Sequence, residues 1–130
     1  MKTFTAAEAA ELLPDVRGLV GQIVELGQLI PELQDQARIH AYRAARSGGS
    51  DLEEQQRLSE SGLRDAELSL QAALIRLEEL GVVLKDAQAG LVDFPSYREG
   101  ELVELCWKLG EAEVSHWHRV GEGFAGRKPL

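Results

Sequence analysis

Apolar side chains recur at alternating intervals of three and four residues along the first 80 positions, which is the spacing of one helix face. Between Pro14 and Arg46 this face is formed by Val16, Leu19, Ile23, Leu26, Ile30, Leu33, Ala37, His40 and Ala44. Between Asp51 and Leu80 the same spacing is given by Leu52, Gln56, Ser59, Leu63, Ala66, Leu70, Ala73, Leu77 and Leu80. The two runs predict long helices that fold back on each other as an antiparallel, coiled-coil-like hairpin.

Local signals predict where these helices begin and end. Thr5 and Glu8 have the spacing of a capping box, which predicts the start of a short first helix. Pro14 disfavours helical geometry at Leu13, so the sequence predicts a break there and a second helix start at Pro14. The glycine pair in Ser47–Ser50 predicts the turn between the two long helices.

The periodicity changes after Gly81, a residue type that commonly ends helices. Short runs with strand character follow at Val82–Lys85, Leu91–Tyr97, Glu101–Leu109 and Glu113–Val120. The last three predict a small antiparallel three-stranded meander, to which the first run can be added. The remaining tail, from Gly121 onward, is expected to be irregular.

Helices followed by strands predict an α+β fold. A length of 130 residues indicates a single domain, with the helical hairpin over residues 1–80 and the sheet and tail over residues 81–130. Further apolar residues lie off the helical seam, among them Val20, Val24, Leu68 and Ile75. They need cover from the sheet or from a second copy of the chain. We therefore expect a homodimer formed through the long helices.

Composition excludes several classes of function. The net charge of −8 argues against non-specific binding of nucleic acid and against docking on an anionic membrane surface. The single cysteine, Cys106, cannot form an intramolecular disulfide. No apolar run reaches the roughly 20 residues that span a bilayer, and the N-terminus has no apolar signal region. A cytoplasmic location is expected. The sequence does not identify a protein partner.

The candidate chemistry lies in the C-terminal part. His116 and His118 are two apart on a predicted strand, so their side chains point to the same face, as two ligands of one metal would. If the preceding connection loops out three residues, Cys106 faces His116 and Glu104 faces His118. A connection one residue shorter or longer would place Cys106 on the opposite face. Further oxygen donors are available at Asp93, Glu111 and Glu113.

The favoured interpretation is a half-exposed strand whose histidines meet water or carboxylates. The alternative is a divalent metal site built from these donors, for which Zn²⁺ or Fe²⁺ suits mixed nitrogen, sulfur and oxygen ligands. Trp107 and Trp117 would point away from the histidines and pack the sheet onto the helices. The motif Gly121–Gly126 matches GxGxxG, but no helix follows it and no βαβ unit surrounds it, so it does not predict nucleotide binding.

Several stretches resemble the DUF2203 family, an uncharacterised prokaryotic family. They are the pattern FTxxEAxxLLPxVR near the start, GLVDFP at Gly90–Pro95, LCWKLGE at Leu105–Glu111, WH at 117–118 and GFAGRKPL at Gly123–Leu130. The resemblance implies a small bacterial or archaeal cytoplasmic protein with a helical hairpin and a small β part, and it implies no activity. The family pattern emphasises Asp93, Cys106, Trp107, Glu111 and His118 more than His116. The resemblance therefore favours a metal site made of an Asp/Cys/Glu/His cluster over one made of the two histidines.

Two functions remain at this point. The two long heptad-like runs, without a convincing catalytic set, favour a homo-oligomeric interaction module that is not an enzyme. The alternative is a metal-binding protein, with a metal-dependent enzyme as one form of it, whose ligands come from the C-terminal sheet.

Overall fold

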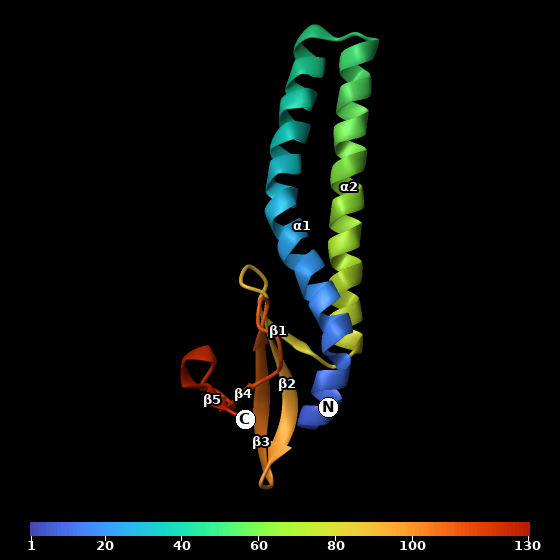
Figure 1. Cartoon of the computed structure of the whole chain (residues 1–130). Coiled ribbons are helices and arrows are strands. Elements are labelled where there is room, and N and C mark those ends of the chain that lie inside the picture. Colours follow the sequence, from blue (N-terminus) through green and yellow to red (C-terminus); the bar gives the residue numbers. More distant parts are fainter. The chain divides into compact units, whose positions relative to one another are not determined.

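The computed structural model describes all 130 residues and contains two long helices followed by a five-stranded antiparallel sheet, so the predicted α+β class and helical hairpin are confirmed (Figure 1). Neither helix has an apolar stretch long enough to cross a membrane. The elements are α1 Ala6–Ser47, α2 Ser50–Glu79, β1 Val83–Asp86, β2 Leu91–Arg98, β3 Glu101–Lys108, β4 His116–Arg119, the 3-10 helix η1 Phe124–Gly126 and β5 Lys128–Pro129.

Helix α1 is continuous, so the prediction of a separate short helix ending before Pro14 is wrong. Proline removes one backbone hydrogen bond and disfavours helical geometry in the residue before it. Here that cost is offset by burial on both sides of the proline, because Leu13, Val16 and Val20 are 5%, 0% and 0% exposed. The capping box at the start of α1 forms as predicted: the Thr5 N–H donates to Glu8 Oε1 and the Glu8 N–H donates to Thr5 Oγ1.

The chain forms two compact units. The first comprises Met1–Val24 and Ala73–Leu130, and the second comprises Glu25–Ala72. Every residue of the two predicted helical seams is buried or half-buried. In the second unit only Ala37 and Ala66 are buried rather than half-buried or exposed.

The sheet has the order β1-β2-β3-β4-β5, and each neighbouring pair is antiparallel. The predicted three-stranded meander is therefore correct at its centre but lacks an edge strand on each side. β1 is the short run that the sequence left optional, and β5 comes from the tail that was expected to be irregular. Glu99 and Gly100 form the two-residue turn between β2 and β3 with φ values of 53° and 80°, as a type I′ hairpin requires.

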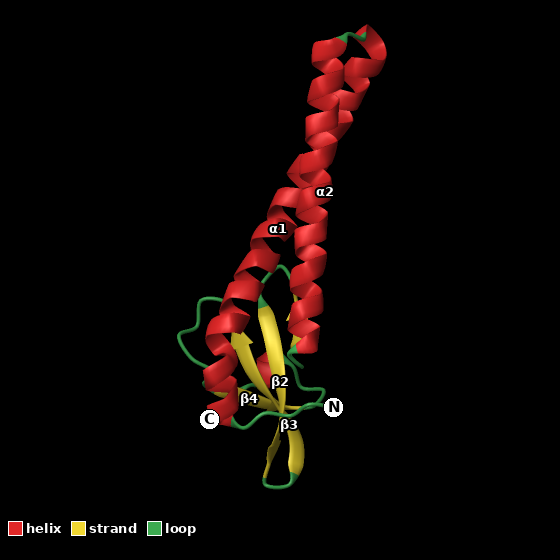
Figure 2. Cartoon of the chain, turned by 90° about the vertical axis from the view of Figure 1, so that its right-hand side faces the viewer, coloured by secondary structure: helices red, strands yellow, loops and turns green.

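One face of the sheet packs against the first turns of α1, which Figure 2 shows beside the strands. The rings of Phe4 and Phe94 meet edge to face with their centroids 5.5 Å apart. Trp107 is fully buried, and the Arg17 guanidinium of α1 lies 5.9 Å from the centre of its ring. This apolar face holds most of the core of the first unit.

Trp117 differs from the expectation that both tryptophans pack against the helices. The cationic groups of Arg98, Arg119 and Lys128 lie 4.7, 5.6 and 5.0 Å from the centre of its ring. Cations from β2, β4 and β5 thus cover Trp117 on the face that Trp107 shares with α1. Cation–π attraction at such distances contributes about 0.5–1 kcal/mol at exposed sites.

Two leucines near the end of α2 provide a matched test of this core. Leu77 is 1% exposed, whereas Leu74 is 38% exposed. We expect Leu77→Ala to lower the free energy of unfolding by about 2–5 kcal/mol, because it leaves a cavity in a packed core. Leu74→Ala removes the same atoms from a partly exposed position and should cost less than about 1 kcal/mol. Urea denaturation of both variants measures the difference, and equal losses would contradict the packing described here.

Candidate functional site

The strand register brings the predicted polar residues together on the central strands. β2 and β3 pair so that Asp93 lies opposite Cys106. β3 and β4 pair so that Cys106 lies opposite His116 and Glu104 lies opposite His118. This is the register that the sequence predicts when the connection between the last two strands loops out three residues. The connection in the structure, between the end of β3 at Lys108 and the start of β4 at His116, is longer. Because alternate residues share a face, all five side chains lie on the side of the sheet that faces away from α1.

Three of these side chains form a buried cluster. The imidazole of His118, the thiol of Cys106 and the carboxylate of Asp93 each offer one ligand atom, and these atoms lie within 4.8 Å of one another. The three residues are 2%, 0% and 1% exposed, respectively. Buried polar groups in such proximity need partners, because each one has lost its hydration.

The hydrogen bonds of His118 fix the role of each ring nitrogen. Its Nδ1 lies 2.9 Å from the carbonyl oxygen of Arg119. A carbonyl oxygen only accepts, so Nδ1 carries the proton. Its Nε2 lies 3.1 Å from Asp93 Oδ1. A neutral ring would therefore direct a lone pair at a carboxylate, and such an arrangement requires either a proton or a metal cation between the two atoms.

The groups around the cluster carry both signs of charge. Lys85 Nζ lies 4.0 Å from Asp93 Oδ2 and 3.8 Å from Glu104 Oε2. Burial, together with the hydrogen bond and the charge of Asp93, raises the pKa of Glu104. Burial and the nearby Asp93 carboxylate raise the pKa of the Cys106 thiol to about 11. Without a bound cation the thiol therefore stays protonated at neutral pH.

Two of the other predicted ligands have different partners. His116 is half-exposed, and its Nδ1 lies 3.1 Å from the Ser115 hydroxyl oxygen. Both carboxylate oxygens of Glu111 accept hydrogen bonds of 2.9 Å from Arg127, and Oε1 accepts a third from the Lys108 N–H at 2.7 Å. Glu111 therefore anchors the C-terminal segment to the sheet. Arg127 also donates to the carbonyl oxygen of Cys106 at 3.4 Å.

Glu113 lies apart from the cluster. It is exposed and lines a different cavity together with Leu13 and Arg17 of α1. Among the oxygen donors proposed from the sequence, only Asp93 belongs to the buried set.

A cavity of about 200 Å³ adjoins the cluster, and we call it the site cavity. It is lined by Lys85, Leu91, Asp93, Glu104, His118, Gly121, Gly123 and Phe124. The sequence analysis did not include Lys85 or Phe124 in the site. Strand alternation does not indicate Lys85, because the register of β1 shifts between Leu84 and Asp86 and leaves Lys85 unpaired. No local pattern indicates that the tail brings Phe124 to this face.

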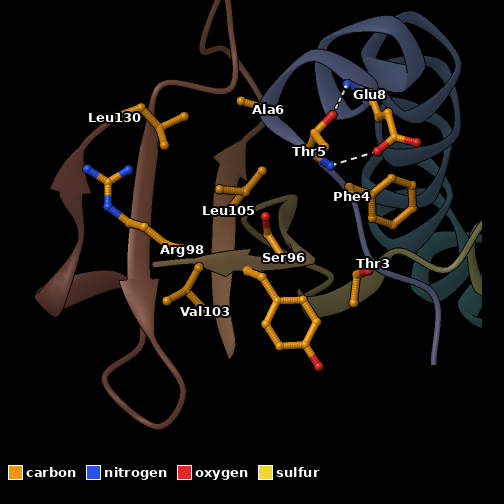
Figure 3. Close-up of a pocket in the computed structure, with 11 residues that line it drawn as sticks. Thr3, Phe4, Thr5, Ala6, Glu8, Ser96, Arg98, Val103, Leu105 and Leu130 are labelled. Atoms are coloured by element: carbon orange, nitrogen blue, oxygen red, sulfur yellow. Dashed lines mark hydrogen bonds between the residues drawn. The ribbon is translucent and has the colours of Figure 1, made fainter. Parts of the chain in front are cut away.

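A second cavity, of about 280 Å³, lies between the N-terminal segment and the opposite face of the sheet (Figure 3). The sticks in Figure 3 show Thr5 and Glu8 already paired by the two hydrogen bonds of the capping box. The other lining residues include both polar and apolar side chains, and Phe4, Val103 and Leu105 form apolar walls. No set of metal-ligating side chains converges there, so this cavity offers less chemistry than the site cavity.

Comparison with known proteins gives one finding. The chain matches the family DUF2203, described as "Uncharacterized conserved protein", over residues 2–130. No curated protein and no solved structure matches the chain. The match therefore covers both the cluster and the site cavity, and it brings no activity with it.

Glu111 allows the anchoring of the C-terminal segment to be tested by pH. The hydrogen bonds from Arg127 lower the pKa of Glu111 in the folded chain. The pair therefore contributes stability above the unfolded-state pKa of about 4.3, and this contribution is lost as the pH falls through the lower folded-state pKa. We expect Glu111→Gln to cost about 0.5–1.5 kcal/mol at pH 7, allowing for solvent screening, and progressively less below pH about 4.

Urea denaturation across this pH range measures the effect. Glu113→Gln is the matched control, because its carboxylate is exposed and should change stability by less than about 0.5 kcal/mol throughout. A Glu111→Gln deficit that persists unchanged at pH 3 would contradict the ion-pair explanation.

Proposed function

The chain belongs to the DUF2203 family, and we propose that it is a metal-binding protein in which Asp93, Cys106 and His118 hold one divalent transition-metal ion. The observation that carries this proposal is the convergence of a carboxylate, a thiol and an imidazole in a buried cluster within 4.8 Å. Mixed oxygen, sulfur and nitrogen donors suit Zn²⁺ or Fe²⁺, and the thiolate favours Zn²⁺ of the two.

The charges of the cluster support a divalent ion. Metal binding displaces the proton of a coordinating thiol, even where burial raises the thiol pKa to about 11, as it does for Cys106. The resulting thiolate and the Asp93 carboxylate together balance two positive charges, so the buried site becomes neutral overall. The carbonyl oxygen of Arg119 holds the imidazole of His118 by its Nδ1–H, which is the usual outer partner of a metal-bound histidine.

The distances also support the proposal. Zinc–ligand bonds of about 2.0–2.3 Å place tetrahedral ligand atoms about 3.3–3.8 Å apart. Separations of up to 4.8 Å would therefore have to shorten by about 1 Å, which small side-chain rotations can supply. Three protein ligands leave one tetrahedral position for water or another group, as in catalytic zinc sites. We propose binding here and assign no reaction.

Titration of the full-length, untagged chain with Co²⁺ as a spectroscopic substitute for Zn²⁺ tests this proposal. We expect one metal ion per chain and a thiolate-to-cobalt charge-transfer band in the near ultraviolet. Cys106→Ser should abolish this band, because no other thiol is present. His118→Ala should weaken binding by about tenfold or more, because it removes a direct ligand.

The matched control is His116→Ala, which removes an imidazole two residues away that already contacts Ser115. It should bind metal like the wild type. Circular dichroism of each variant separates loss of metal from loss of fold. Absence of stoichiometric binding by the wild type, or equal losses in His116→Ala and His118→Ala, would leave a structural Asp93–His118 ion pair as the explanation of the cluster.

A second candidate function, a homodimer formed through the helical hairpin, is supported by the unit Glu25–Ala72. Large apolar side chains are exposed on both of its helices, including Ile39, Tyr42, Leu58 and Leu68 at 48%, 64%, 58% and 56%. The charges of the two helices are complementary. Residues 36–47 contain three arginines and no acid, whereas residues 51–67 contain six carboxylates and two arginines. A second copy whose helical turn lies beside this one, with α1 against the α2 of the partner, would pair these opposite charges while covering the apolar residues.

Sedimentation equilibrium at micromolar concentration tests the dimer. We expect a two-chain mass, and we expect Leu68→Glu to shift the equilibrium toward the monomer because it places a charge in the interface. Val83→Glu is the control, since Val83 is 41% exposed but lies on the sheet rather than on the hairpin. A monomeric wild type would exclude this candidate without affecting the metal proposal.

A further inference from the structure

The site cavity combines one cation with apolar walls beside the metal-binding cluster. Lys85 is the only cationic side chain among its lining residues. Its ammonium group lies close to two carboxylates, but the side chain is 45% exposed and so remains accessible. Leu91 and Phe124 provide apolar walls. A ligand that suits this lining has one negatively charged end and a short apolar body.

The loop that borders the cavity contributes Gly121, Gly123 and Phe124 to its lining. Its backbone hydrogen bonds run from the N–H groups of Glu122, Gly126 and Arg127 to the carbonyl oxygens of Arg119, Gly123 and Phe124, respectively. These bonds leave the N–H groups of three cavity-lining residues without a backbone acceptor, namely Gly121, Gly123 and Phe124. Free N–H groups in a glycine-rich loop are a common means of binding an oxyanion.

Size and charge narrow the class of ligand. A cavity of about 200 Å³ is smaller than the roughly 300–1,000 Å³ that accommodates drug-sized ligands, so the ligand has only a few carbon atoms. Asp93 and Glu104 already place two acidic groups in the lining, which disfavours an anion with two charges. A single lysine balances one carboxylate, whereas a phosphate dianion would need a second cation.

From these observations we infer that the site cavity binds a small monocarboxylic acid, whose carboxylate takes the free metal position and pairs with Lys85 while its carbon chain packs on Leu91 and Phe124. This inference rests on the proposed metal site, because the metal supplies the coordination position that the carboxylate takes. It goes beyond that site by naming the chemical class of the ligand and a binding residue outside the metal ligands.

Butyrate added to the Co²⁺-loaded full-length chain tests the inference. We expect a saturable change in the visible absorption of the bound cobalt, because a carboxylate entering the free position alters its coordination. Butyramide has the same size and no charge, so it should leave the spectrum unchanged. Lys85→Met keeps the aliphatic stem and removes the charge, and it should weaken butyrate binding by about tenfold or more. Its affinity for cobalt should stay the same or increase, because a cation near the metal is removed.

Lys2→Met is the matched control, because Lys2 belongs to the same unit but does not line the site cavity. It should bind butyrate like the wild type. The inference is overturned if butyrate does not change the cobalt spectrum, if Lys85→Met binds butyrate as tightly as the wild type, or if inorganic phosphate binds more tightly than butyrate. These results would leave the metal site standing, whereas failure of the wild-type chain to take up cobalt would remove both proposals.

Discussion

A carboxylate withdrawn from water must be neutralised or hydrogen-bonded, and Asp93 lies near the middle of the sheet with 1% of its surface exposed. The arrangement of the other polar groups follows from this constraint. β4 supplies the imidazole of His118, and the edge strand β1 supplies the ammonium group of Lys85. Burial, together with the hydrogen bond and the negative charge of Asp93, raises the pKa of the neighbouring Glu104. A metal ion would satisfy the same constraint with a larger positive charge.

The sheet is covered on both faces, and this explains why its central strands do not alternate between buried and exposed residues. Val92, Asp93 and Phe94 are consecutive in β2, and all are buried. Val92 and Phe94 face the side of the sheet that α1 covers, where apolar side chains form the core. Asp93 faces the other side, where the loop containing Gly121–Phe124 borders the site cavity. The same few strands therefore hold an apolar core and a polar site separated by the thickness of one sheet.

The sequence predicts those features that depend on local periodicity. The helical seams, the central hairpin and the shared face of His116 and His118 follow from spacing alone. The shared face of Cys106 and His118 follows only for a connection that loops out three residues before the last strand, one of the lengths that the sequence leaves open. Features that depend on tertiary contacts could not be predicted in this way. Helix α1 has no break at Pro14. The burial of the residues on both sides of this proline outweighs the local preference of Leu13 for a non-helical conformation. Glu111 pairs with Arg127, sixteen residues away, and no local pattern indicates that this carboxylate is already occupied.

The two-residue turn formed by Glu99 and Gly100 has a consequence for how such a site can change during evolution. Its length sets the register of β3 against β2, and one added or deleted residue would turn every side chain of β3 to the opposite face. Cys106 would then enter the core beneath α1, and Asp93 would lose its neighbour although no site residue had changed. The length of the turn thus determines which face of the sheet each side chain of β3 occupies. A homologous chain could keep the equivalents of Asp93, Cys106 and His118 but have a turn of different length. Its sequence would then contain the three site residues, but they would not lie close together.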